Sequence, residues 1–198
     1  MTIAYSNIPN TFPLDLSTLK LTHEQFYKLC IANPEQPLEL TAAGILIFMS
    51  PVGGESGKRE ADLLVDLGIW NRQTQLGAVF SSSTIFKLPL GSQRSPDVAW
   101  VALSRWNALT NEDRQKFPPL APDFVVELRS RTDNLSELQA KMVEYRDNGV
   151  RLGLLINPQD RQVEIYRIGA EVEVLQSPTS INCDDVLPGF KLSLANIF

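Results

Sequence analysis

Two acidic residues and a lysine on three consecutive predicted elements have the side chains that metal-assisted chemistry requires. Asp97 begins an apolar strand, Glu127 lies within the next buried strand, and Lys141 lies on the helix that follows. Two carboxylates that converge on one point repel each other strongly unless a divalent cation lies between them. Their hard oxygen ligands suit Mg²⁺, which keeps several waters and can share its coordination sphere with a phosphate. A lysine nearby could orient a water or offset charge on a phosphoryl transition state.

The strand around Glu127 is the element from which the other assignments follow. Phe124–Leu128 is a short apolar run rich in β-branched residues, which predicts a buried strand. An acid in such a strand is costly unless a cation or hydrogen bonds hold it, and an ion pair with a nearby arginine such as Arg129 is the structural alternative to a metal site. Asp123 lies four residues from Glu127, which is about 13 Å along a strand and too far for one shared ion. Asp97, on a separate strand, has no such limit.

Lys141 lies at the edge of the apolar stripe of its helix. That stripe consists of Leu135, Leu138, Met142 and Tyr145. A lysine in this position can bury its stem and reach the end of the sheet. The alternative is an exposed helix salt bridge, because Glu137 and Glu144 lie within one turn of Lys141.

The pattern of the whole chain predicts a single α/β domain with a mixed sheet flanked by helices. Residues 1–20 are polar and contain prolines, so they are predicted to be an irregular lead-in to a domain that covers 21–198. Thr22 and Gln25 have the spacing of a capping box, and Ser56 is predicted to cap a helix over 57–72. The other predicted elements are a helix up to about 148, a helix or loop over 107–116, and strands over 38–41, 44–49, 78–80, 84–88, 95–101, 153–156, 162–166, 171–175 and 191–194.

Composition excludes several classes of protein. A chain of 198 residues with 43% hydrophobic content forms a sizeable core, and its net charge of −5 argues against a purely electrostatic nucleic-acid binder. Cys30 and Cys183 show no metal spacing, and a single histidine, His23, predicted to be exposed, argues against a zinc site or a Ser-His-Asp triad. Residues 1–6 lack a signal-peptide pattern and no apolar run could span a membrane, so a cytoplasmic location without membrane contact is expected.

Several motifs occur together in this chain. They are Pro96-Asp97, Glu127-Leu128-Arg129-Ser130 and Leu138-Gln139-Ala140-Lys141-Met142-Val143-Glu144-Tyr145, with further matches at 38–40, 51–55, 148–153 and 156–158. With these motifs, roughly residues 20–170 resemble the Uma-two family of restriction endonucleases, formerly a domain of unknown function. That family belongs to the PD-(D/E)XK nuclease-like superfamily.

The resemblance implies a restriction-endonuclease-like fold and a Mg²⁺- or Mn²⁺-dependent endonuclease that hydrolyses phosphodiester bonds of DNA. Its metal ligands would be Asp97, Glu127 and the backbone carbonyl of Leu128. The superfamily pattern has lysine two residues after the glutamate, where this chain has Arg129. Arginine does not surrender a proton, so it can neutralise a phosphate but not act as a base. Lys141 matches a helix lysine of the family and would take the missing role.

Two features leave an alternative function open. Glu39 matches a family glutamate that could assist the site, whereas Arg131 stands where many relatives carry proline. With Arg129 at the usual lysine position and an acidic net charge, the domain could instead be a non-catalytic nucleic-acid- or protein-binding module. A homodimer is compatible with either function.

Overall fold

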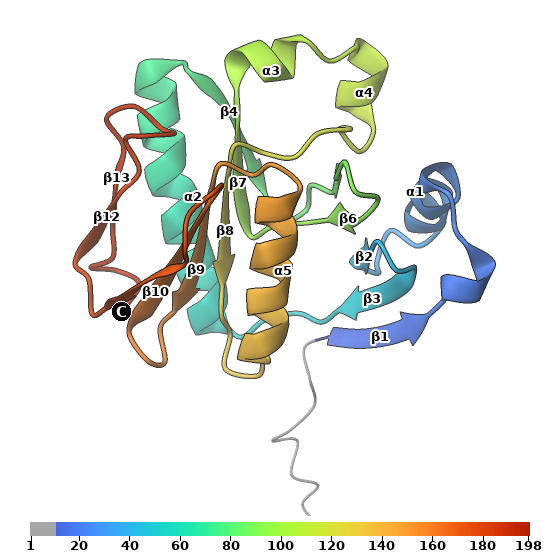
Figure 1. Ribbon diagram of the computed structural model, residues 1–198, viewed down its shortest axis with the longest axis horizontal. Helices are drawn as coiled ribbons and strands as arrows, with labels where there is room; N and C mark the ends of the chain where they lie inside the picture. Colours follow the sequence, from blue (N-terminus) through green and yellow to red (C-terminus); the bar gives the residue numbers. More distant parts are fainter. Residues whose placement is uncertain (1–10) are drawn as a thin grey trace, which may run out of the picture.

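The strand predicted around Glu127 is β8, Phe124–Leu128, in the interior of a six-stranded mixed sheet (Figure 1). The computed structural model describes residues 11–198. The strand order is β11-β10-β9-β8-β7-β4, and β8 pairs parallel with β9 and antiparallel with β7. The other strands are β4 (Gly77–Ser81), β7 (Val98–Ala102), β9 (Leu152–Asn157), β10 (Gln162–Arg167) and β11 (Glu173–Gln176). The predicted α/β class and the predicted central strands are therefore confirmed.

Two long helices pack on opposite faces of this sheet. They are α2, Gly54–Thr74, and α5, Leu135–Asp147. Val126 packs in one core cluster with residues of α2, whereas Val125 packs in the other with Met142 of α5. Successive side chains of a strand point to opposite faces, so Glu127 lies on the same face as Val125, toward α5.

A second sheet of five strands lies beside the first, in the order β1-β3-β2-β6-β5 (Figure 1). Its strands are β1 (Thr11–Asp15), β2 (Leu38–Leu40), β3 (Ile45–Met49), β5 (Phe86–Lys87) and β6 (Gln93–Arg94). After β4 the chain leaves the six-stranded sheet, adds β5 and β6 to this second sheet, and returns as β7. The sequence predicted one sheet, but residues 11–198 contain these two sheets and a separate two-stranded ribbon, because the N-terminal strands β1, β2 and β3 pair with one another and with β6 rather than with the six-stranded sheet.

Helix α1, His23–Ala32, covers the five-stranded sheet, and Phe26 packs there with Leu38, Leu40 and Leu46. The predicted capping box is confirmed, because Gln25 N–H donates to Thr22 Oγ1 at 3.2 Å and Thr22 N–H donates to Gln25 Oε1 at 2.8 Å. His23 is exposed, as predicted.

Other predictions need correction. The irregular lead-in over 1–20 contains β1 and a 3-10 turn, Ser17–Leu19, because β1 pairs with the β2–β3 hairpin. The part of that prediction on residues 1–10, including the absent signal peptide, lies outside the described residues. Helix α2 begins at Gly54 with Gly53 as its cap, so Ser56 is not the cap.

The remaining elements are short. They are α3 (Leu103–Asn107), α4 (Asn111–Gln115) and a ribbon of β12 (Ser180–Asn182) with β13 (Lys191–Ser193). The region over 107–116 that was predicted as a helix or loop contains α4, whereas α3 and β12 were not predicted. Within residues 11–198, no helix has the length and apolar character that crossing a membrane requires.

The close packing of β4 on β7 gives a test of the fold. A Cβ atom at Gly77 would lie 2.3 Å from the carbonyl oxygen of Val101, whereas nothing lies within 4 Å of a Cβ at Gly68 in the middle of α2. We expect Gly77→Ala to lower the free energy of unfolding by roughly 1–3 kcal/mol. Gly68→Ala should raise it by about 1 kcal/mol, because alanine restricts the unfolded chain. Urea unfolding measures both changes, and equal stabilities would contradict the described packing.

Candidate active site

The pairing of β7 with β8 sets Asp97 opposite Glu127. Val98 pairs with Val126 in antiparallel register, and continuing that register by one residue makes Asp97 the partner of Glu127. Directly opposed residues have Cβ atoms about 5 Å apart, and like charges in such a pair destabilise it. Asp97 is half-buried, and its Oδ2 accepts a hydrogen bond of 2.6 Å from Leu128 N–H. Two carboxylates are thus held at the same end of adjacent strands.

Lys141 lies between two buried glutamates. Its Nζ is 2.9 Å from Glu127 Oε1 and 2.9 Å from Glu39 Oε1. Tyr145, one turn further along α5, donates its hydroxyl to Glu127 Oε1 at 2.9 Å. Both structural alternatives are therefore wrong: Glu127 pairs with Lys141 rather than with a neighbouring arginine, and Lys141 is paired within the core rather than with the glutamates of its own helix.

Arg94 extends the ion pair into a network of alternating charge. It contacts Glu39 Oε2 at 2.9 Å and also pairs with Glu144 of α5. Glu39 additionally accepts the N–H of Ser95 at 2.8 Å. The sequence did not predict a role for Arg94, because it lies on β6, Gln93–Arg94, and a strand of two residues gives no periodic signal. The order of charges is then Glu144, Arg94, Glu39, Lys141 and Glu127.

Burial and charge separate the pKa values of the acids. Burial and the charge of Glu127 raise the pKa of Asp97 well above its ordinary value. Burial also raises the pKa of Glu127, which Lys141 only partly offsets. For Glu39, burial is outweighed by Lys141 and Arg94, so its pKa is lowered. Burial opposes the charge of Lys141, but Glu127 and Glu39 outweigh it and raise the lysine pKa. Lys141 therefore remains a cation and cannot serve as a base at neutral pH.

The structure places Arg129 outside this cluster. Its Nη1 is 3.2 Å from Asp160 Oδ2. Arg129 lines a hollow of about 580 Å³ together with Arg59 and Arg131. Its Nε is buried without a hydrogen-bond partner among the described residues. Arg129 thus follows Glu127 closely in the sequence, but it lines a separate, arginine-rich hollow.

Asp123 has a structural role at the opposite end of β8. Its Oδ2 accepts the N–H of Ala102 at 2.8 Å, and its Oδ1 lies 3.0 Å from Arg105 and 3.6 Å from Arg151. The sequence argument that separated Asp123 from the site of Glu127 agrees with this position.

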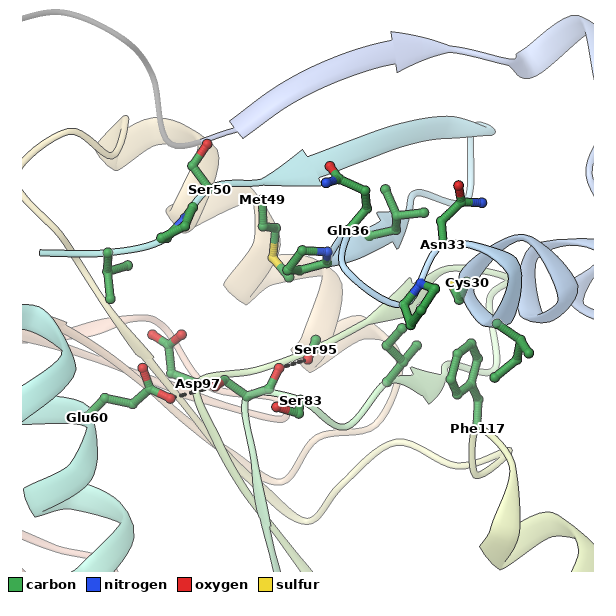
Figure 2. Close-up of a pocket in the computed structure, with 18 residues that line it drawn as sticks. Cys30, Asn33, Gln36, Met49, Ser50, Glu60, Ser83, Ser95, Asp97 and Phe117 are labelled. Carbon is green, nitrogen blue, oxygen red and sulfur yellow. Dashed lines mark hydrogen bonds between the residues drawn. The ribbon is translucent and has the colours of Figure 1, made fainter. Parts of the chain in front are cut away.

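A third acid, Glu60, lies near Asp97 and was not predicted. It comes from the second turn of α2, and Ser82 donates its hydroxyl to Glu60 Oε1 at 2.6 Å. Its charge contributes to the raised pKa of Asp97. Asp97 and Glu60 share the wall of a cavity of about 730 Å³ (Figure 2). The sequence pattern of α2 indicated only its apolar stripe, and a glutamate in a charged stretch with Arg59 and Asp62 gives no local signal.

The donor atoms of this site suit a hard divalent cation. Glu127 of β8 and Asp97, directly before β7, supply carboxylate oxygens, and a cation would offset both the burial and the repulsion by Glu127 that raise the pKa of Asp97. Among residues 11–198 no group of three or more acidic, histidine or cysteine side chains is close enough to hold an ion by itself. Two carboxylates fit Mg²⁺, which completes its coordination with waters and phosphate oxygens.

Comparisons with known proteins agree with this architecture. A family model described as "Uma2: Putative restriction endonuclease" matches residues 23–195. The fold is similar to a crystal structure from Anabaena variabilis, described as "a putative nuclease belonging to DUF820", with a TM-score of 0.75 and 19% sequence identity. The similarity covers 90% of this chain and 97% of that chain. No curated protein matches the chain.

Asp97 is expected to lower the stability of the folded protein at neutral pH. A carboxyl with a raised pKa binds more protons in the folded than in the unfolded state, so the free energy of unfolding falls as pH rises above about 4. Asp97→Asn removes this loss of stability, because asparagine has no charge to bury. Its amide oxygen can still accept the hydrogen bond from Leu128 N–H. At pH 7 and without metal, the variant should melt about 2–4 °C above the wild type. The gain should shrink toward pH 4, and a lower melting temperature at pH 7 would contradict the repulsion between the acids.

Lys141 is expected to stabilise the fold through its two buried partners. Lys141→Met leaves Glu39 and Glu127 without their shared cation, which should cost about 3–5 kcal/mol at pH 7. The unpaired carboxyls would then have raised pKa values, so the loss should be smaller at pH 5 than at pH 7. Lys58→Met is the control, because Lys58 pairs with Asp62 at the surface and should change stability by less than about 0.5 kcal/mol. Denaturant unfolding at both pH values measures the difference, and equal losses in the two variants would refute the role.

Proposed function

Because the chain belongs to the Uma2 restriction-endonuclease family, we propose that it is a Mg²⁺- or Mn²⁺-dependent endonuclease that hydrolyses phosphodiester bonds of DNA in the cytoplasm. The observation that carries the proposal is that Asp97, which directly precedes β7, reaches β8 next to Glu127 and accepts the N–H of Leu128 at 2.6 Å, with Lys141 2.9 Å from Glu127. Such a set of hard oxygen ligands beside a fixed cation suits chemistry at a phosphate.

In this proposal Asp97 and Glu127 would hold the ion, with the backbone carbonyl of Leu128 as a further ligand. When bound, the ion polarises a phosphodiester oxygen and lowers the pKa of a coordinated water. The hydrogen bond from Leu128 N–H fixes one oxygen of Asp97, and the Tyr145 hydroxyl fixes one oxygen of Glu127. Both carboxylates therefore require little rearrangement when an ion binds.

Lys141 would stabilise negative charge that develops on the phosphate. Its ammonium is held by Glu39 and Glu127 and remains protonated, so its contribution is electrostatic and it accepts no proton. Glu39 acts through Lys141 as a positioning residue. Arg129, in the neighbouring hollow, would bind a phosphate oxygen with its planar guanidinium rather than replace the lysine of the superfamily pattern.

A second candidate function is a non-catalytic nucleic-acid- or protein-binding module. One observation favours it: Lys141 is engaged by two carboxylates and Arg129 by Asp160, so both cations already have anionic partners. Titration calorimetry with Mg²⁺ and Mn²⁺ distinguishes the two functions. Metal binding that disappears in Glu127→Gln supports the nuclease, and equal, negligible binding in both proteins supports the module.

Cleavage assays test the roles of the individual residues. We expect Mn²⁺-dependent cleavage of plasmid and single-stranded DNA by the wild type, and none by Asp97→Asn or Glu127→Gln. Lys141→Met should bind metal yet cleave about two to three orders of magnitude more slowly, the usual effect of losing one transition-state donor. Arg94→Met is the matched control, because it removes the other buried cation that pairs with Glu39.

Comparing Lys141→Met with Arg94→Met distinguishes a loss of catalysis from a loss of folded protein. Circular dichroism at the assay temperature establishes that each variant is folded. If Lys141→Met and Arg94→Met lose the same activity, Lys141 acts only through the stability of the network. Cleavage that survives Glu127→Gln would refute the proposed site.

A further inference from the structure

The cavity beside Asp97 has walls unlike those expected around a phosphate alone. Its volume is about 730 Å³, and most of its lining comes from three segments, over 30–38, 49–52 and 82–85. Most of its lining is apolar, including Ile31, Pro37, Met49, Val52, Ile85 and Phe117. Figure 2 shows Asp97 and Glu60 at one side of the cavity, with Met49, Gln36 and Asn33 across from them. The candidate metal ligand Asp97 therefore forms part of one wall of a mainly apolar chamber.

The size and chemistry of this chamber fit a nucleobase. Small-molecule sites of about 300–1,000 Å³ have mostly apolar walls with a few polar groups that fix orientation. A nucleobase has apolar faces, which stack on apolar and aromatic side chains, and polar edges, which require hydrogen-bonding partners. Asn33, Gln36 and Ser83 supply polar groups at the border of the cavity.

A base can enter the chamber only when it is unpaired. In a duplex the phosphates lie outside and the bases are stacked within, so a phosphate at Asp97 would leave the chamber empty unless a base were turned out of the stack. The chain also has a net charge of −5, which gives little general attraction to a duplex.

The arginine-rich hollow supplies cations where a single strand would need them. It lies on the other side of the loop that leads into α2: Val52 lines the chamber, whereas Gly53 and Arg59 line the hollow. Arg129 of this hollow follows directly after Leu128, whose N–H contacts Asp97. The chamber and the arginine-rich hollow therefore adjoin along the loop over 51–54, and apolar walls beside cations suit a strand of alternating bases and phosphates.

We propose that the chamber binds an unpaired nucleobase next to the scissile phosphate, so that the substrate is single-stranded or locally unpaired DNA rather than an intact duplex. This inference rests on the proposed nuclease function. The arginine-rich hollow binds the neighbouring phosphate.

The first experiment compares substrates with the wild-type protein. One oligonucleotide is offered with Mn²⁺ as a single strand, as a perfect duplex, and as a duplex with an unpaired bulge. We expect cleavage of the single strand and at the bulge to exceed cleavage of the perfect duplex by about tenfold or more. Replacing single nucleotides by abasic ones should locate one position where the loss of the base slows cleavage by a similar factor. Equal cleavage of all three forms, or no effect of any abasic position, would overturn the proposal.

The second experiment fills the chamber. Ser83 is exposed at its border, so Ser83→Trp should obstruct the chamber without disturbing the core. Ser104→Trp is the matched control, because Ser104 is exposed on α3 and does not line the chamber. Ser83→Trp should raise KM for the single strand about tenfold or more, and it should not slow cleavage further where the critical base is already absent. Melting temperature and metal binding should remain those of the wild type. Equal KM values in the two variants would overturn the proposal.

A binding assay in EDTA separates this inference from the proposed function. The fluorescence of 2-aminopurine in a single-stranded oligonucleotide reports on stacking of that base without any cleavage. A change on binding to the wild type and Ser104→Trp, but not to Ser83→Trp, supports the chamber even if no metal-dependent cleavage is found. No binding by the wild type would overturn the chamber proposal, whereas cleavage without such binding would leave the nuclease function standing.

Discussion

The ion pair of Lys141 with Glu39 and Glu127 is the interaction on which the site depends. Glu39 belongs to the five-stranded sheet, Glu127 to the six-stranded sheet, and Lys141 to the helix that covers the latter. A buried charge without a partner is very costly, so each of these three residues requires the other two. Arg94 carries the alternation of charge further by pairing with Glu39 and with Glu144. The network thus fixes how the two sheets approach each other.

This network compensates the acids at the junction unequally. Glu39 has two cations beside it and its pKa is lowered, whereas the pKa of Glu127 stays raised although Lys141 and a hydroxyl contact it. Asp97 makes no ion pair within residues 11–198, and burial and the charge of Glu127 outweigh the charge of Lys141 and the N–H of Leu128. The result is a stable frame around one carboxylate whose charge is unfavourable in the absence of a cation. Functional sites commonly retain such local instability, because a bound ion or substrate recovers it.

Local patterns in the sequence were sufficient for the central elements and for part of the candidate site. The apolar run around Glu127 predicted the buried strand β8. The stripe of α5 placed Lys141 at its edge, from which it reaches the sheet. These predictions succeeded because strand alternation and helical periodicity involve neighbours within a few residues, and such neighbours are visible in the sequence.

The tertiary structure decided what those residues contact. Strands β2 and β6 are distant in sequence but paired, and this pairing brings Arg94 to Glu39 and Glu39 to Lys141. The entry of α2 beside Asp97 brings Glu60 to the cavity, and the β9–β10 turn holds Arg129 at Asp160. Sheet order, loop excursions and the meeting of loops around a cavity depend on contacts between distant segments. No local periodicity encodes these contacts, so the sequence determined which residues could form a site and the fold determined which of them meet.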